Sequence, residues 1–177
     1  MTVTTPTKTL AIAAASRHGS TTEIADRLAD DLTEALPDLW RVARVDLTDL
    51  RAFDSADAVI LGSAVYYGRW IRGAARALDH LREVPPADLW LFSTGPVSEI
   101  ESENEHIISA DSMADLGGAD EHMVFGGKLD STQLSFAERI VVKAVHARPG
   151  DHRRWDIVDA WARHIAHELG ARDAHKP

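Results

Sequence analysis

Hydroxyl side chains and a glycine are concentrated in one short segment near the start of the chain. The segment reads Ser16-Arg17-His18-Gly19-Ser20-Thr21. It separates an apolar run from a helical pattern, and the start of a helix favours a negative charge. Its hydroxyls and glycine exceed what a helix cap needs, so the whole segment is predicted to bind a phosphate. Arg17 and His18 are included among these cofactor-binding residues; each could face the phosphate or point into solvent, and solvent is the favoured interpretation. It is not a Walker A loop, because the lysine and the glycine spacing of that motif are missing.

Aromatic residues gather in a second segment, which reads Ser63-Ala64-Val65-Tyr66-Tyr67-Gly68-Arg69-Trp70. A flat apolar ring system binds well against aromatic side chains. Two tyrosines at a loop tip are uncommon without a ligand or a partner, so we expect a planar ligand here. Trp70 fits equally well as a residue packed in the core at the start of the next helix.

A third segment, Ser93-Thr94-Gly95-Pro96-Val97, combines hydroxyls with a glycine and with a proline of fixed φ. Taken alone, it fits any loop. The order of the surrounding strands therefore decides whether the three segments form one site.

Strand and helix patterns alternate along the chain. Strands are predicted at Leu10–Ala15, Trp40–Leu47, Asp57–Gly62, Leu89–Ser93 and Met123–Phe125. Helices are predicted over about Ser20–Leu36, Ile71–Leu81, Asn104–Leu116, Thr132–His146 and Trp155–Leu169. Ser20 and Glu23 have the spacing of a capping box for the first helix, and Pro37 ends it.

This alternation predicts a single α/β domain over residues 1–177, built on a doubly wound parallel sheet of five strands in the order 2-1-3-4-5. An insert follows the fourth strand, and an extra helix precedes the last one. Ligands of such sheets bind beyond the carboxyl ends of the strands, at the switch point between strands 1 and 3. That rule brings the three segments together at one site.

Composition and charge narrow the function. The net charge of −9 argues against nucleic acid as a partner. Eight acidic residues and no Lys or Arg lie in an acidic insert at about 98–121, which is predicted to be solvated or, alternatively, to dock a basic partner. The sequence has no cysteine, secretory signal or transmembrane run, which indicates a cytoplasmic protein. Its nine histidines form no convincing ligand set, so no metal site is predicted.

The three segments resemble those of the flavodoxin family. The pattern Ser16-x-x-Gly19-x-Thr21 after a first strand is similar to the flavodoxin phosphate loop, and the other two segments are similar to the loops that hold the isoalloxazine ring. A closer likeness is to the flavodoxin-domain group that includes menaquinone-dependent protoporphyrinogen oxidase, through the insert, the extra helix and a last helix led by Trp155-Asp156. Two features differ from that oxidase: the insert is acidic rather than basic, and Tyr66-Tyr67 replaces an Arg-Tyr pair.

The resemblance implies a flavodoxin-like fold with bound FMN. The phosphate would lie on Ser16, Gly19, Ser20 and Thr21, and the ring would lie between the tyrosine pair and the Ser93–Pro96 loop. A flavin carries the chemistry while the protein tunes it, so no catalytic side chain is predicted. The expected reaction transfers electrons or hydride between FMN and a small-molecule or protein partner, with a quinone among the candidates.

Other functions stay open from the sequence. A cofactor-free binding or scaffold protein can use the same fold, with the tyrosines in a partner interface. An NAD(P)H-dependent quinone reductase, or a protoporphyrinogen oxidase proper, would also hold FMN. A receiver domain is excluded, because acids after strand 1, an Asp at the end of strand 3 and a Lys after strand 4 are all missing. The extra helix leaves a homodimer open.

Overall fold

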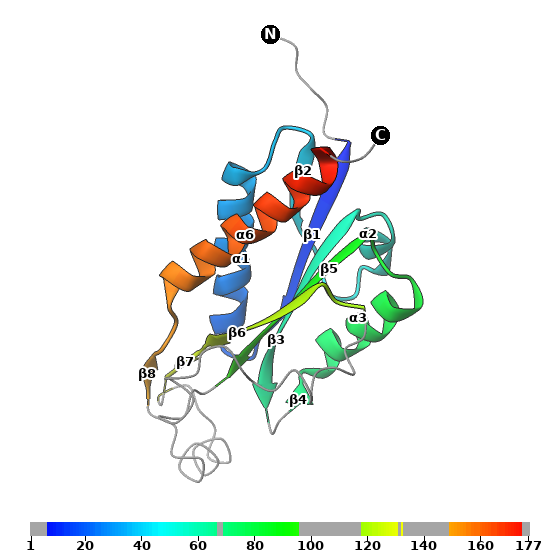
Figure 1. Ribbon diagram of the computed structural model, residues 1–177. Helices are drawn as coiled ribbons and strands as arrows, with labels where there is room; N and C mark the ends of the chain where they lie inside the picture. The colour runs from blue at the N-terminus through cyan, green and yellow to red at the C-terminus, as the bar shows by residue number, and fades with distance from the viewer. Residues whose placement is uncertain (1–6, 67–68, 96–117, 131, 133–148, 175–177) are drawn as a thin grey trace.

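The apolar runs of the sequence form five parallel strands at the centre of the computed structural model (Figure 1). They are β1 (Lys8–Ala15), β2 (Trp40–Arg44), β3 (Ala58–Tyr66), β5 (Asp88–Gly95) and β6 (Glu121–Gly126). The structure describes residues 7–66, 69–95, 118–130, 132 and 149–174. The strand order is β2-β1-β3-β5-β6, with the two-residue strand β4 (Arg69–Trp70) off this path, so the predicted order is confirmed.

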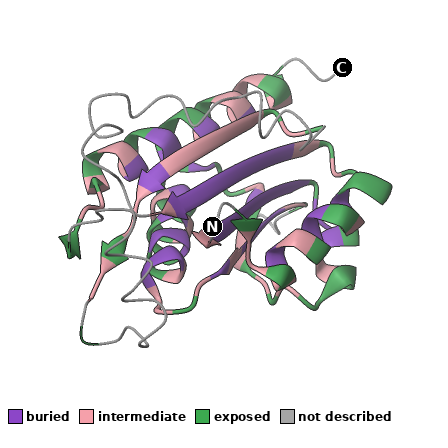
Figure 2. Cartoon of the chain, turned by 90° about the horizontal axis from the view of Figure 1, so that it is seen from below, coloured by how far each residue is buried: buried purple, intermediate pink, exposed green. Residues whose placement is uncertain are grey.

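Helices cover both faces of this sheet, and the strands between them are largely buried (Figures 1 and 2). One face carries α1 (Ser20–Ala35) and α6 (Trp155–Ala174), and the other carries α2 (Leu50–Asp54) and α3 (Arg72–Glu83). Among the described residues, no helix is long and apolar enough to span a bilayer. The helix predicted at 104–116, the acidic insert up to residue 117, and the helix predicted at 132–146 apart from its first residue lie outside the described residues.

The two faces of the sheet have different cores. The face under α1 and α6 is aromatic: the rings of Phe92, Phe125 and Trp161 meet edge to face, with centroids 5.6–6.2 Å apart. The other face is built mainly of alanine, valine and leucine. Gly62 on β3 makes room for the Phe92 ring of β5, because a Cβ at Gly62 would lie 2.1 Å from Cζ of that ring. A glycine is therefore a packing requirement at this point of the sheet.

The second strand and the region after it differ from the prediction. β2 ends at Arg44 rather than Leu47, because the chain turns away after the N–H of Val45 has donated to the carbonyl of Ile12 (3.0 Å). The turn leads into α2, which the sequence analysis missed. Asp49 caps this helix by accepting a hydrogen bond from the N–H of Ala52 (3.1 Å). Five residues are too few to show a helical period.

Strands β3 and β5 extend further than predicted. β3 runs to Tyr66 instead of Gly62, and β5 runs to Gly95 instead of Ser93. The two strands stay in parallel register through Ala64 and Thr94. Residues expected in loops are therefore held in the sheet, because pairing with a neighbouring strand satisfies their backbone groups. β3 then folds back on β4 in an antiparallel pair.

A two-stranded antiparallel ribbon follows β6 at the carboxyl end of the sheet (Figure 1). It consists of β7 (Lys128–Leu129) and β8 (Gly150–Asp151). The ribbon is tied to the third segment, because the N–H of Gly127 donates to the carbonyl of Gly95 (3.1 Å). The sequence carried no periodic signal for so short a pair.

Candidate cofactor-binding site

The phosphate-binding segment joins the end of β1 to the start of α1. Gly19 is the N-terminal cap of α1 and adopts a left-handed backbone with φ of 85°, a conformation that favours glycine. Because Gly19 has no side chain, no capping side chain occupies the first N–H groups of the helix. Such N–H groups, together with the positive end of the helix dipole, form an anion site.

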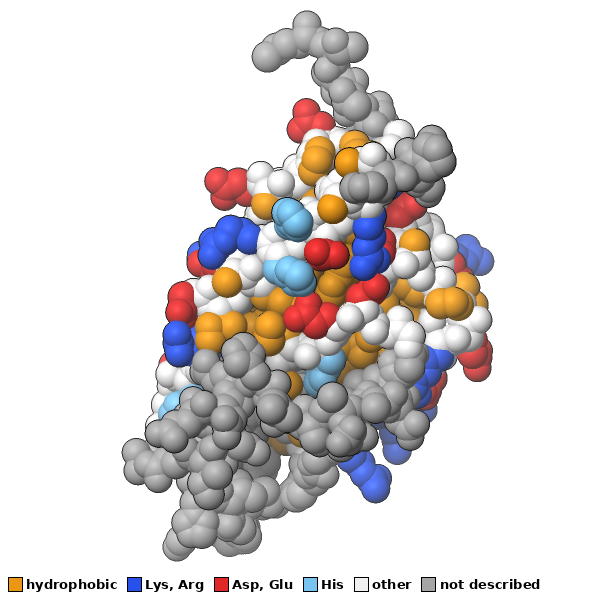
Figure 3. All heavy atoms as spheres, in the orientation of Figure 1, with side chains coloured by type: hydrophobic (Ala, Val, Ile, Leu, Met, Phe, Trp, Pro, Cys, Tyr) orange, Lys and Arg blue, Asp and Glu red, His pale blue; other side chains and the backbone are white. Residues whose placement is uncertain are grey.

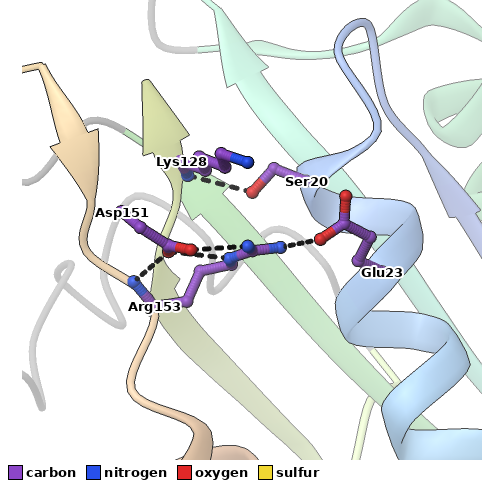
Figure 4. A network of polar contacts seen from close by, with 5 residues as sticks. All are labelled: Ser20, Glu23, Lys128, Asp151 and Arg153. Carbon is purple, nitrogen blue, oxygen red and sulfur yellow. Dashed lines mark hydrogen bonds and ion pairs between the residues drawn. The ribbon is translucent and has the colours of Figure 1, made fainter. Parts of the chain in front are cut away.

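The predicted capping box is wrong. Ser20 is the first residue of α1 rather than its cap, and its hydroxyl accepts a hydrogen bond from the backbone N–H of Lys128 (2.9 Å; Figure 4). Glu23 pairs instead with Arg153. Both side chains contact residues in the β7–β8 ribbon or just after it, so tertiary contacts take the place of the local cap.

A pair of buried threonines joins the first segment to the third. The hydroxyl oxygens of Thr21 and Thr94 lie 2.6 Å apart, and either can donate. Both residues are almost fully buried. The Thr21 hydroxyl therefore joins the start of α1 to the end of β5, a role that the sequence pattern did not reveal.

Ser63 and Ser93 hold β4 and the start of α3 against the sheet. The Ser63 hydroxyl accepts from the N–H of Ile71 (3.0 Å) and donates to the carbonyl of Ala64 (2.9 Å). The Ser93 hydroxyl accepts from the indole N–H of Trp70 (2.8 Å). Trp70 is partly buried against the aliphatic core. The structure thus favours the packing role for Trp70 over a place in the open part of the site.

His122 on β6 completes this buried chain and was not singled out from the sequence. Its Nε2 lies 2.9 Å from the Ser93 hydroxyl, and burial lowers its pKa. Because the indole of Trp70 can only donate, Ser93 has its own proton free to give to Nε2 of a neutral His122. The three side chains fix the base of the aromatic segment from two neighbouring strands.

Arg17 and Tyr66 connect the first segment to the second. The Arg17 guanidinium lies 4.4 Å from the centroid of the Tyr66 ring, within the range of a cation–π contact. Arg17 is exposed, as expected, while Tyr66 is half-buried. Tyr66, at the end of β3, is therefore in contact with the guanidinium of the first segment.

The other predicted site residues lie near these contacts or outside the described part of the chain. Ser16 and His18 are half-buried between β1 and α1, and Ala64, Val65 and Gly95 are strand residues. Tyr67, Gly68, Pro96 and Val97 lie outside the described residues. The structure brings the described parts of all three segments to the carboxyl ends of β1, β3 and β5.

A charged cluster borders the start of α1 and was also missed (Figure 4). Arg153 binds Asp151 and Glu23, and its side chain is only 5% exposed. The hydrogen bonds from Arg153 lower the pKa of Asp151 to about 2. The same partners raise the pKa of Arg153. No sequence motif links these residues, since Glu23 and Arg153 are 130 positions apart.

The histidines of the described chain do not assemble a metal site. His164 lies 3.3 Å from Glu121, between α6 and β6. Among the described residues, no group of three or more His, Asp or Glu side chains is arranged to hold a metal ion. The face around α6 and β6 mixes acidic, basic, histidine and apolar side chains (Figure 3), which is typical of a solvated surface.

Comparison with known proteins identifies the class. Residues 11–155 match the flavodoxin domain family, so the chain belongs to that family. Its members are flavodoxin-like electron-transfer proteins, and the domain typically binds FMN. No curated protein matches the sequence.

Solved structures agree on the fold. The rubredoxin oxygen:oxidoreductase of Desulfovibrio gigas is 18% identical with a TM-score of 0.58, and the match covers 96% of this chain but only 38% of that protein. A flavodoxin of Streptococcus pneumoniae is 19% identical with a TM-score of 0.57, over 93% of this chain and 99% of that one. An archaeal flavodoxin is 14% identical with a TM-score of 0.54, over 92% and 99% of the two chains.

Proposed function

We propose that this protein binds one FMN at the carboxyl ends of β1, β3 and β5 and transfers electrons between it and a small-molecule or protein partner. The observation that carries the proposal is the start of α1, where a left-handed Gly19 leaves the first helical N–H groups without a capping side chain. A dianionic phosphate suits these donors and the helix dipole.

The residues around that helix start fit the phosphate group. Ser16 and Ser20 lie on either side of Gly19. The Ser20 hydroxyl accepts a bond from Lys128, so its own proton remains available to a phosphate oxygen. The Thr21–Thr94 pair keeps the loop against the sheet. Hydroxyl and backbone donors of this kind hold an oxyanion without a lysine.

The ring side of the site is supplied by strand ends. Tyr66 at the end of β3 offers an aromatic face, and Gly95 at the end of β5 offers backbone without a side chain. The hydroxyls of Ser63 and Ser93 already make hydrogen bonds within the protein, so they position the segments around the ring rather than bind the ring itself. When bound, the flavin supplies the electron-transfer chemistry, while the protein orients it and controls access.

The test is a titration of purified protein with FMN, followed by absorbance, flavin fluorescence and melting temperature. We expect bound-flavin bands, quenched fluorescence and a raised melting temperature. Ser16→Ala should weaken FMN binding by about 1.5–3 kcal/mol, the value of a hydrogen bond to a charged group. Thr33→Ala, which removes a hydroxyl at an exposed site further along the chain in α1, is the control and should leave affinity unchanged.

A protein that stays colourless and ignores FMN would overturn the proposal. It would favour a cofactor-free binding protein that uses the same strand ends as an interface.

A narrower form of the proposal concerns the partner. Trp155-Asp156 at the start of α6 is the described feature shared with the group that includes menaquinone-dependent protoporphyrinogen oxidase. Reduction of a menaquinone analogue by the FMN-loaded protein, with protoporphyrinogen as donor, would support membership of that group. Turnover with other donors only would leave a flavodoxin-like carrier.

A further inference from the structure

Arg153 is a buried cation beside the start of α1. Its guanidinium makes two hydrogen bonds to Asp151, from Nε to Oδ1 (2.8 Å) and from Nη2 to Oδ2 (2.6 Å). A further nitrogen binds Oε2 of Glu23. Figure 4 shows the guanidinium lying between the two carboxylates, one from β8 and one from the first turn of α1. Only 5% of the Arg153 side chain is exposed.

Glu23 is the link between this cation and the phosphate-binding segment. While its Oε2 faces Arg153, its other oxygen turns back towards the glycine of the segment. Oε1 lies 3.9 Å from the point that a Cβ of Gly19 would occupy. The Glu23 carboxylate therefore lies next to Gly19, whose left-handed conformation leaves the first helical N–H groups available to an anion.

An unpaired carboxylate at that place would oppose the binding of an anion. The start of a helix attracts negative charge, but two like charges close together repel, and the effect is strongest for a dianion. Arg153 offsets the charge of Glu23 and is itself held on the β7–β8 ribbon by Asp151, so the three side chains together carry one negative charge, whereas the two carboxylates alone would carry two. The same ribbon donates the Lys128 N–H to the Ser20 hydroxyl.

We propose that Arg153 is a positioning residue that neutralises Glu23 and thereby makes the start of α1 selective for a phosphorylated flavin over an unphosphorylated one. The inference rests on the proposed function, because it assigns the preference for FMN over riboflavin to one buried ion pair. The β7–β8 ribbon acts as the support that keeps Arg153 in place when the site is empty.

The experiment compares FMN and riboflavin binding to the full-length protein and its variants. The readout is the ratio of the two Kd values, riboflavin over FMN. Arg153→Met should lower this ratio about tenfold or more, because Glu23 is left unpaired beside the phosphate. Adding Glu23→Gln to that variant should restore most of the ratio.

Two further variants guard against loss of folding. Glu23→Gln alone changes an exposed side chain and should raise the ratio, since Arg153 then faces the site with one partner fewer. Arg154→Met changes the neighbouring arginine, which binds Asp156 instead, and should leave the ratio unaltered. Far-UV circular dichroism checks each variant.

The outcomes separate the inference from the function it rests on. If Arg153→Met weakens FMN and riboflavin equally, or the double variant does not recover, Arg153 is structural only and the inference is overturned. A wild-type protein that binds neither flavin would overturn the proposed function as well. A restored ratio in the double variant would support the charge-neutralising role, because a general loss of structure would weaken both flavins and leave their ratio unchanged.

Discussion

The two ends of the sheet are closed by different chemistry. At the amino end, charged side chains of α6 reach across the strands. Asp173 binds Lys8 and accepts from the indole N–H of Trp40 (2.8 Å), and Arg172 pairs with Asp88 and Asp120. At the carboxyl end, buried hydroxyls join the strands and loops, as in the Thr21–Thr94 and Trp70–Ser93 pairs.

This difference implies that the amino end contributes mainly to stability and the carboxyl end to ligand binding. At the amino end, the charged groups are paired with each other, so their donors are not available to a ligand. These ion pairs instead attach the last helix to the sheet. Hydroxyls and helix N–H groups can exchange a protein partner for an oxyanion, so the carboxyl end can bind one. Variants of the amino-end ion pairs should therefore change stability alone, whereas variants between the two ends, and variants of the Arg153 cluster at the carboxyl end, should change both stability and affinity.

The largest effect is expected between the two ends, at Gly62. Gly62→Ala would place a Cβ 2.1–2.6 Å from three atoms of the Phe92 ring. Such overpacking should lower the free energy of unfolding by about 3 kcal/mol. Because β3 and β5 carry two of the three segments, FMN affinity should fall with it. Urea unfolding and FMN titration measure the two effects.

Gly170→Ala is the matched control for this prediction. It lies in α6, and nothing is within 4 Å of a Cβ placed there. A helical Gly→Ala change should instead raise stability by about 0.5–1 kcal/mol without altering affinity. A mild effect of Gly62→Ala would show that the Phe92 ring can move aside, and that β3 and β5 are not rigidly spaced.

A smaller effect is expected at the amino end, where stability alone should change. Asp173→Ala removes the partner of both Lys8, which is partly exposed, and the indole of Trp40, which is buried. The loss should be about 1–2 kcal/mol in urea unfolding, with FMN affinity unchanged. A weakened FMN affinity would contradict the separation of the two ends.

The smallest effect is an acid dependence at the carboxyl end. The pKa of Asp151 is lowered from its usual 3.8 to about 2 by hydrogen bonds from Arg153. A depressed carboxyl pKa adds stability above pH 3.8 that is lost as the pH falls through about 2. Since Asp151 is 43% exposed, solvent screening reduces the contribution to about 1 kcal/mol.

Unfolding free energies between pH 4.5 and 2.5 provide the measurement. Arg153→Met should return the Asp151 pKa towards its usual value and remove this part of the acid dependence. An unchanged titration of Asp151 in that variant, followed by NMR, would show that Arg153 does not hold the carboxylate in solution.

Much of the fold follows from the sequence because its signals are local. The unbroken apolar run Ala58–Leu61 predicted a central strand, and it is fully buried. The spacing of Val158, Ala162, Ile165 and Leu169 predicted the buried face of α6, and all four are in the core. The crossover rules then leave few strand orders to consider.

The errors at Ser63 and in the capping box share one cause, which is a partner distant in the chain, whereas α2 was missed because five residues are too few to show a helical period. Ser63 reads as the first residue of a loop, but pairing with β5 keeps it in a strand. Ser20 and Glu23 read as a capping box, but Lys128 and Arg153 take both side chains. Local turn chemistry cannot reveal a competitor more than a hundred residues away.

The sequence by itself determined the alternation of strands and helices, the glycine-containing segment before α1, and the placing of the three segments at the carboxyl ends of β1, β3 and β5. These depend on residue periodicity and on backbone preferences of neighbours. Only the tertiary structure decided which hydroxyls make hydrogen bonds within the protein, and only it paired Arg153 with Glu23. Hydrogen bonds and ion pairs need partners at 2.6–3.3 Å. Strand register and helix packing bring such partners together, and no short stretch of sequence specifies either of them.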